Sequence, residues 1–187
     1  LPICAIINNI TITESPAWLK TALTNVGIRA INSIVDITNY VMLDLGQPLH
    51  AFDLAQIPDH TVNVRHALLL EPITLLDGAT YTLDPSMLVI ASTDKPLALA
   101  GIMGGQSSAV TPETHSILLE AATFDATSIR RTAGKLGLRT DASMRFEKSL
   151  DPHLPEQALA KALELIAELC PSAQLFGKPT DHFPEPP

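Results

Sequence analysis

Hydrophobic residues recur every three or four positions in several stretches of this chain, the spacing that places them on one buried face of an α-helix. This spacing predicts helices over 15–27, 33–45, 127–137 and 154–169, and a short one over 142–150. The first helix is expected to begin with Ser15 as N-cap and Pro16 at the first helical position, and to bury a stripe that includes Trp18 and Val26. Glycine is expected to end three of these helices, at positions 27, 46 and 137.

Between residues 61 and 121 the pattern changes to short apolar runs, which predict strands. These runs lie at 62–64, 73–76, 81–83, 87–91, 97–102 and 117–121, and a further strand is predicted within 1–12. Asp77-Gly78, between two of the runs, is typical of a β-hairpin turn. Helices on both sides of a block of strands, without regular βαβ alternation, predict the α+β class.

Composition indicates a folded chain that fits one large domain or two small ones. Its 187 residues are 46% hydrophobic and 17% charged, which is typical of folded proteins and not of disordered ones. We expect one domain over 1–170 and a proline-rich tail or linker over 171–187. No apolar run reaches the length of about 18 residues that a membrane span requires. Without a leader or an initiator methionine before Leu1, the chain is expected to be a piece of a longer protein.

The formal net charge of −8 argues against a general nucleic-acid-binding protein, but the basic residues are unevenly placed. Six of the twelve lysines and arginines lie between Arg130 and Lys148. Such a basic stripe can attract a phosphate backbone to one face, and it can equally be a solvated helix surface. Without a secretory signal, Cys4 and Cys170 are expected to be free thiols rather than a disulfide.

A hydroxyl, an amide and an imidazole lie in and just after the helix predicted at 33–45, as Thr38, Asn39 and His50. A glycine and a proline stop this helix, so the chain can fold back and bring the three side chains to one pocket. Neutral imidazole can orient a water or accept its proton, and the hydroxyl and amide supply donors and acceptors. His50 alone could equally be structural. His50 and Asp53 could form half of a metal site, but no further ligand is visible, so we expect no metal.

Three glycines, Gly101, Gly104 and Gly105, follow the apolar run 97–100. Glycine permits positive φ and the close approach of a ligand to backbone N–H groups. The spacing matches neither a dinucleotide-binding fingerprint nor a P-loop, which requires a lysine. A tight turn without a ligand is the alternative interpretation.

One acidic residue, Glu120, interrupts an apolar run between Leu119 and Ala121. A buried carboxylate without a partner is unfavourable, so Glu120 either faces solvent or has a dedicated partner. A buried carboxylate that awaits a hydroxyl donor would make a discriminating pocket.

Three long motifs occur in a fixed order along the chain. They are the segments 34–53 (IVDITNYVMLDLGQPLHAFD), 99–105 (LAGIMGG) and 138–147 (LRTDASMRFE). Together they resemble the B3/B4 domain of the bacterial phenylalanyl-tRNA synthetase β subunit, over about residues 10–151. One departure is Ser149, where the family pattern has glycine, and we expect it to affect a local turn and not the chemistry.

The resemblance implies a three-layered α+β fold with a β-sandwich of unusual topology, and an editing site that hydrolyses tyrosine mistakenly esterified to tRNA(Phe). In that scheme the catalytic residues are Thr38, Asn39 and His50. Substrate binding falls to Glu120, Gly101, Gly104 and Gly105. The tRNA would contact Arg130, Arg131, Lys135 and Arg139.

The resemblance also implies the partners and the compartment. The partners would be tRNA(Phe), mischarged tyrosine and the α subunit of an α2β2 enzyme, all in the cytoplasm and without a membrane. No cofactor is expected in this domain, since ATP and magnesium serve the parent enzyme. Two alternatives stay open: a non-catalytic module that binds tRNA or the other subunit, and a free-standing domain of the same fold that acts on another substrate.

Overall fold

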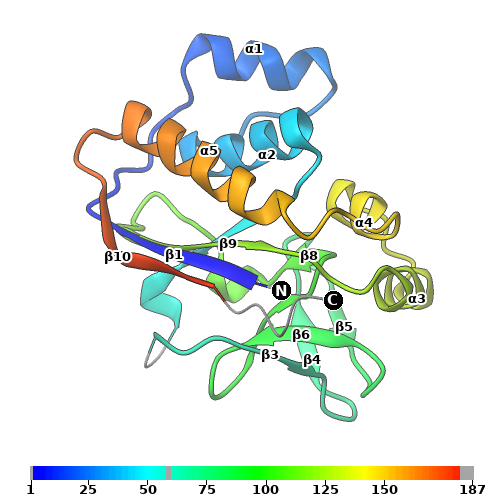
Figure 1. Cartoon of the computed structure of the whole chain (residues 1–187). Helices are drawn as coiled ribbons and strands as arrows, with labels where there is room; N and C mark the ends of the chain where they lie inside the picture. Colours follow the sequence, from blue (N-terminus) through cyan, green and yellow to red (C-terminus); the bar gives the residue numbers. More distant parts are fainter. Residues whose placement is uncertain (1, 58–59, 182–187) are drawn as a thin grey trace. The chain divides into compact units, whose positions relative to one another are not determined.

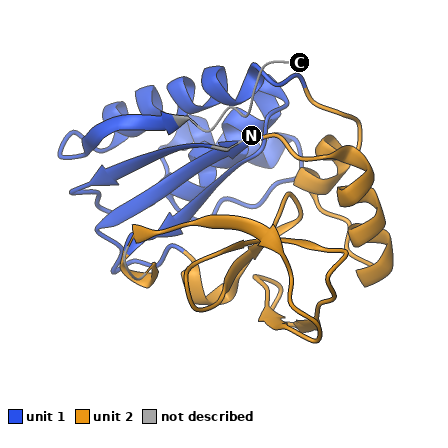
Figure 2. Ribbon diagram, turned by 60° about the horizontal axis from the view of Figure 1, so that its bottom comes forward, with its two compact units in different colours: residues 1–54, 110–122, 151–187 blue, residues 55–109, 123–150 orange. Residues whose placement is uncertain are grey.

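The computed structural model describes residues 2–57 and 60–181, which form two compact units (Figure 2). The first unit comprises Leu1–Leu54, Val110–Ala122 and Asp151–Pro187, and the second comprises Ala55–Ala109 and Thr123–Leu150. Both contain helices and antiparallel strands, which confirms the predicted α+β class. The single domain predicted over 1–170 is divided here into two compact units, and residue 170 lies inside the first of them.

Four antiparallel strands form the sheet of the first unit, in the order β10-β1-β9-β2 (Figure 1). Their bounds are Pro2–Asn8 for β1, Leu49–Asp53 for β2, Ser116–Ala122 for β9 and Gln174–Asp181 for β10. Strand β10 corrects the prediction that 171–187 is a tail or linker, of which 182–187 lies outside the described residues. It pairs with β1 at the edge of the sheet, where a proline such as Pro179 is tolerated.

Three helices of the first unit lie on one side of this sheet: α1 (Ala17–Asn25), α2 (Ser33–Leu45) and α5 (Leu154–Leu169). The bounds of α2 and α5 are those predicted from the sequence. The hydrophobic core under these helices contains odd-numbered strand residues, namely Ala5, Ile7, Ala51, Ile117, Leu119 and Ala121. Because side chains alternate along a strand, the even-numbered residues of β1, β2 and β9 point to the opposite face.

Helix α1 differs from its prediction at the start and in its buried face. It begins one residue later than expected, with Pro16 as N-cap, because the Ser15 hydroxyl donates instead to the buried Asp36 carboxylate at 2.6 Å. Trp18 and Val26 are 43% and 59% exposed, so the predicted buried stripe is too wide.

The connection from α2 to β2 is fixed by a glycine and a buried glutamine. Gly46 ends α2 with a φ of +79°, and its N–H donates to the Met42 carbonyl at 3.0 Å. The Gln47 side chain is fully buried and donates to the carbonyls of Pro48 at 2.9 Å and Ala122 at 2.8 Å. Gln47 therefore ties the start of β2 to the end of β9.

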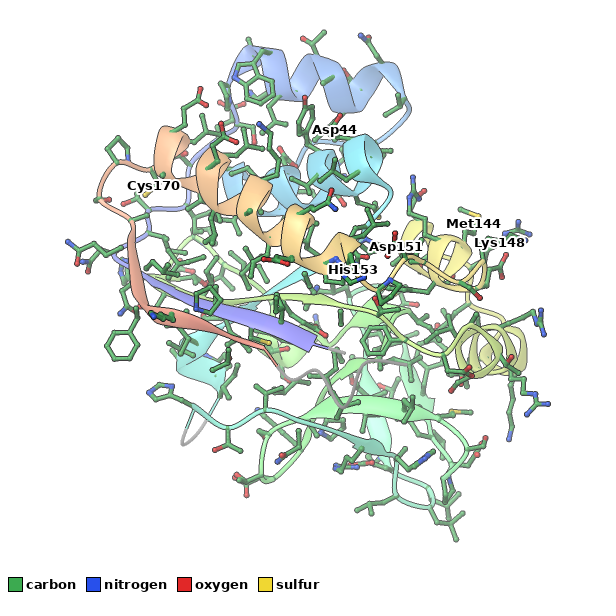
Figure 3. All side chains as sticks on the ribbon, viewed as in Figure 1. Asp44, Met144, Lys148, Asp151, His153 and Cys170 are labelled. Carbon is green, nitrogen blue, oxygen red and sulfur yellow. The ribbon has the colours of Figure 1, made fainter. Side chains whose placement is uncertain are left out.

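Both cysteines are free thiols, as expected. Cys170 follows α5 and is buried (Figure 3), and its Sγ accepts the backbone N–H of Thr11 at 3.3 Å. Cys4 lies on β1 and is half-buried.

The second unit contains a four-stranded antiparallel sheet in the order β3-β6-β7-β8 and a separate hairpin, β4-β5. The bounds are β3 Asn63–His66, β4 Pro72–Thr74, β5 Thr80–Thr82, β6 Leu88–Ala91, β7 Pro96–Leu99 and β8 Met103–Gly104. Among the described residues, short 3₁₀ turns lie at Leu54–Gln56, where the chain enters this unit, and at Gln106–Ser108. The predicted hairpin around Asp77-Gly78 is confirmed, with a longer loop in which the Leu75 N–H donates to the Ala79 carbonyl.

Two helices belong to the second unit, α3 (Ala126–Leu136) and α4 (Asp141–Phe146). Thr140 caps α4 through a capping box with Ser143. The helix ends at Phe146, four residues before the predicted end, and Ser149 then adopts a φ of +62°. This left-handed conformation favours glycine, which gives a physical reason for glycine at this position in the family pattern.

Replacing Ser149 with glycine is expected to stabilise the domain by about 0.5–1 kcal/mol. The substitution removes a left-handed conformation that is unfavourable by roughly 1–2 kcal/mol for a residue with a Cβ, and part of the gain is offset by the greater freedom of glycine in the unfolded chain. Chemical denaturation measures the difference. Ser128→Gly, inside α3, is the matched control and should instead destabilise by about 0.5 kcal/mol. Equal effects at the two positions would contradict the role given to the left-handed turn.

Candidate functional site

Three titratable side chains lie in one row across the sheet of the first unit: Cys4 on β1, Glu120 on β9 and His50 on β2. Glu120 is the direct cross-strand partner of both Cys4 and His50. Directly opposed residues of antiparallel strands share a face, with Cβ atoms about 4.5–5.5 Å apart. The row therefore lies on the sheet face opposite the helices, with Glu120 directly beside His50.

Glu120 is a buried carboxylate with an unsatisfied oxygen. Its side chain is 6% exposed, and its Oε1 is buried without a hydrogen-bond partner. Burial raises the pKa of Glu120 from 4.5 to about 7. A buried acid with an unsatisfied oxygen and a raised pKa is unfavourable for folding and is typical of a functional site. Oε1 is thus available to a hydrogen-bond donor on a ligand.

Glu120→Gln is expected to stabilise the domain at high pH and to have little effect at low pH. The folded pKa of about 7 lies above the reference value of 4.5, so the folded state binds the extra proton and its stability falls as pH rises through 7. The ionised carboxylate then costs up to about 3 kcal/mol, which glutamine avoids. Denaturation of both proteins at pH 4 and pH 8 measures this difference. The exposed Glu113→Gln is the control, and a stability difference that does not depend on pH would contradict the prediction.

His50 presents a neutral imidazole beside Glu120. Its ring packs edge-on against buried Phe52, with centroids 4.4 Å apart, which fixes the ring plane. Burial lowers the pKa of His50 from 6.5 to about 4, so the ring carries no charge at pH 7. Its Nε2 is buried without a hydrogen-bond partner. This nitrogen can therefore accept from a water or donate to one, depending on the tautomer.

Asp53 lies three positions after His50 on β2, so the two side chains point to opposite faces of the sheet. Its carboxylate accepts the Thr114 hydroxyl at 2.9 Å. Within 2–57 and 60–181, no group of three or more His, Cys, Asp or Glu side chains is arranged to hold a metal ion.

Thr38 and Asn39 lie in the middle of α2, the helix that precedes β2. Thr38 is buried and its hydroxyl donates to the Val35 carbonyl at 2.7 Å, while Asn39 is half-buried. No hydrogen bond joins either of them to His50 or Glu120, all four being described residues. The structure therefore brings together Glu120 and His50 of the predicted set, and the catalytic role of Thr38 and Asn39 stays a prediction.

Gly101, Gly104 and Gly105 belong to the second unit, around β8. Gly101 has a φ of +68°, and a Cβ there would lie 2.7 Å from the Ile129 side chain. A Cβ on Gly105 would lie 2.4 Å from the Leu97 carbonyl oxygen, which already accepts the Gly105 N–H at 2.7 Å. At Gly101 and Gly105, close packing against the protein itself accounts for glycine, so the tight-turn alternative holds there without requiring a ligand.

Gly105→Ala is expected to destabilise the domain by about 3 kcal/mol, because the new methyl group overlaps a backbone carbonyl that is fixed in the sheet. Gly134→Ala is the matched control in the same unit. Gly134 lies inside α3 with no atom within 4 Å of an added Cβ, so alanine there should stabilise by about 0.5–1 kcal/mol. Thermal and chemical denaturation of the two variants provide the comparison, and similar stabilities would contradict the close contact at Gly105.

The four basic residues predicted to contact tRNA also lie in the second unit. Arg130, Arg131 and Lys135 are on α3 and Arg139 follows it, and all four are exposed. Lys135 forms an ion pair with Asp84 at 2.6 Å. Among the described residues, none pairs with the three arginines, whose charges are therefore available to a phosphate group.

Two residues were not predicted from the sequence: Cys4, the third member of the row, and Gln47, which ties the start of β2 to the end of β9. Gln47 lies inside the motif 34–53, where an amide between a glycine and a proline was a usable signal. The place of Cys4 depends on the pairing of β1 with β9, which no local pattern indicates.

The chain is similar to known proteins over most of its length. A family model described as the B3/4 domain matches residues 3–171. The chain belongs to this family. Among curated proteins, this B3/4 domain is similar to the phenylalanine--tRNA ligase beta subunit of Carboxydothermus hydrogenoformans, with 48% identity over 180 residues, which cover 96% of this chain and 22% of that protein.

Other relatives of the B3/4 domain carry the same name. The subunit of Solibacter usitatus is 45% identical over 185 residues, covering 97% of this chain and 24% of the relative. That of Dehalococcoides mccartyi is 52% identical over 165 residues, covering 88% and 20%. The chain thus spans about a fifth to a quarter of the length of the curated relatives it matches.

A solved N-terminal fragment of the phenylalanyl-tRNA synthetase beta-subunit from Pyrococcus horikoshii aligns with a TM-score of 0.48 and 11% identity, covering 87% of this chain and 45% of that one. In the part of the B3/4 domain that the structure describes, no helix combines the length and apolar character needed to cross a membrane.

Proposed function

We propose that this B3/4 domain is the editing domain of a phenylalanine--tRNA ligase β subunit, and that it hydrolyses tyrosine esterified by mistake to tRNA(Phe). The observation that carries the proposal is the unsatisfied Oε1 of buried Glu120 directly opposite His50. The names of the curated relatives support the parent enzyme.

Tyrosine differs from phenylalanine by one phenolic hydroxyl. A hydrophobic pocket discriminates against a substrate with such an added hydroxyl by only about 10²-fold. A second site that requires the hydroxyl reverses the selection. Glu120 accepts the phenolic hydrogen bond, whereas phenylalanine leaves the carboxylate desolvated and unpaired. The editing site then removes the amino acid that the synthetic site fails to reject.

Hydrolysis adds water across the ester and releases tyrosine and the free tRNA hydroxyl. His50, neutral at pH 7 and with Nε2 available, orients the attacking water or takes its proton. The Thr38 hydrogen is already donated to Val35, so only its oxygen is available, as an acceptor. Thr38 and Asn39 lie on α2, which covers the sheet face opposite His50 and Glu120, so their catalytic role stays a prediction. The substrate-binding role of Gly101, Gly104 and Gly105 stays a prediction. An activated ester needs modest help, so holding the water in place suffices.

The proposed partners follow from this role. They are tRNA(Phe), approached through Arg130, Arg131, Lys135 and Arg139, and the α subunit of the synthetase. Water is the sole co-reactant of the hydrolysis, so the domain needs no cofactor, and ATP and magnesium belong to the charging reaction. The compartment proposed is the cytoplasm, where tRNA is charged.

Deacylation of tyrosyl-tRNA(Phe) and phenylalanyl-tRNA(Phe) by this chain, and by the full-length protein with its partner subunit, tests the proposal. The tyrosyl ester should be hydrolysed at least about 10²-fold faster than the phenylalanyl ester. Binding of tRNA without hydrolysis of either ester, in both proteins, would instead support the alternative of a non-catalytic module, which the unpaired arginines favour. Equal hydrolysis of the two esters would contradict tyrosine selection.

A further inference from the structure

Cys4 is the neighbour of Glu120 on the side away from His50. In the sheet register, Thr180 of β10, Cys4, Glu120 and His50 follow one another across the four strands. The Thr180 hydroxyl is exposed and donates to the Cys4 carbonyl at 3.5 Å, so it does not serve Glu120. Cys4 is therefore the side chain that directly flanks the Glu120 carboxylate from β1.

The Cys4 thiol is uncharged and gives Glu120 no hydrogen bond in this structure. Burial, and then the neighbouring Glu120 carboxylate, raise the pKa of Cys4 to about 12. The side chain therefore stays a thiol at neutral pH, neither a nucleophile toward an ester nor a strong donor. With neutral His50 on the other side, both cross-strand neighbours of Glu120 leave its Oε1 unsatisfied.

We propose that Cys4 is a specificity-determining residue of the editing site: it fills the position next to Glu120 without supplying a competing donor, so that Oε1 can be satisfied by a substrate hydroxyl. This inference rests on the proposed editing function. A hydroxyl in place of the thiol would donate to Glu120 from within the protein. Phenylalanine would then leave no unpaired charge, and the main penalty against its hydrolysis would disappear.

The pair Cys4→Thr and Cys4→Val tests this role, because the two side chains have nearly the same shape and differ in one hydroxyl. Both are β-branched and suited to a strand. In the full-length protein, single-turnover hydrolysis of tyrosyl- and phenylalanyl-tRNA(Phe) gives the selectivity ratio. Threonine should lower this ratio about 10-fold relative to valine, which corresponds to one internal hydrogen bond to the carboxylate. Cys4→Ser and Cys4→Ala form a second, smaller pair that should show the same difference.

A second readout separates this role from a general effect on packing. A donor that stabilises the ionised carboxylate lowers its pKa, so the pH at which selectivity is half lost should move down in the threonine variant and stay in place with valine. If the wild type is selective and the threonine and valine variants behave alike in both readouts, Cys4 has no such role. If the wild type itself shows no selectivity, the proposed function fails instead.

Discussion

Glu120→Ala should lower the preference for the tyrosyl ester over the phenylalanyl ester by about 10²-fold, while slowing hydrolysis of the phenylalanyl ester little or not at all. The wild-type carboxylate, 6% exposed and unpaired at Oε1, gains a charge-assisted hydrogen bond with tyrosine and remains unpaired with phenylalanine. A difference of about 3 kcal/mol between these states corresponds to the expected loss. Single-turnover deacylation of both esters measures it, with the exposed Glu113→Ala as control. A variant that still discriminated fully would show that Glu120 is not the group that senses the hydroxyl.

The same carboxylate makes selectivity depend on pH in a defined direction. Because burial raises the pKa of Glu120 to about 7, the group is increasingly protonated as pH falls below 7. A protonated carboxyl bears no charge that phenylalanine could leave unpaired, so the wild-type ratio should fall between pH 8 and pH 5.5. Glu120→Gln should keep a low ratio over this whole range.

Local sequence signals predicted the helices whose ends are marked by particular residues. The bounds of α2 followed from helical spacing and the glycine at position 46, and the structure places that glycine in the left-handed conformation which ends the helix. The predicted buried stripe of α1 is too wide, because spacing alone does not tell which of its apolar residues face the core. Trp18, for example, is partly exposed.

The arrangement of the site depends on long-range pairing that periodicity does not contain. Residues 4, 50 and 120 meet because β1 and β2 flank β9, and a shift of one residue in either register would separate them. Strand β10 was missed for a related reason. Its sequence, with Gly177 and Pro179, is typical of a loop, and it becomes a strand by pairing with β1 at the edge of the sheet.

An acidic residue within an apolar run was nevertheless a usable sign that Glu120 has a special role. The sequence left two possibilities, exposure to solvent or a buried carboxylate with a dedicated partner. The structure excludes exposure and leaves Oε1 unsatisfied, so this oxygen is available to a donor on a ligand.

His50→Ala should reduce the rate of tyrosyl ester hydrolysis by about 10²-fold and leave the preference for tyrosine largely intact. The ring is held edge-on by Phe52 and offers an unpartnered Nε2, so its loss removes a group that orients or deprotonates the water. Glu120 remains, and with it the requirement for a hydroxyl. The exposed His115→Ala is the matched control in the same unit and should have no effect on the rate. An unchanged rate in the His50 variant would leave the positioning of water to Thr38 and Asn39.

The pH profile of that rate separates His50 from an ordinary surface histidine. Burial lowers its pKa to about 4, so the ring should stay neutral, and the rate flat, from pH 8 through 6.5 and down to about pH 5. Below that, protonation occupies the free nitrogen and the rate should fall. The profile is measured in the Glu120→Gln background, because this substitution removes the titration near pH 7. An inflection of the rate at pH 6.5 would mean that the imidazole is solvated and becomes charged as it does in water. The water-positioning role derived from its burial would then be wrong.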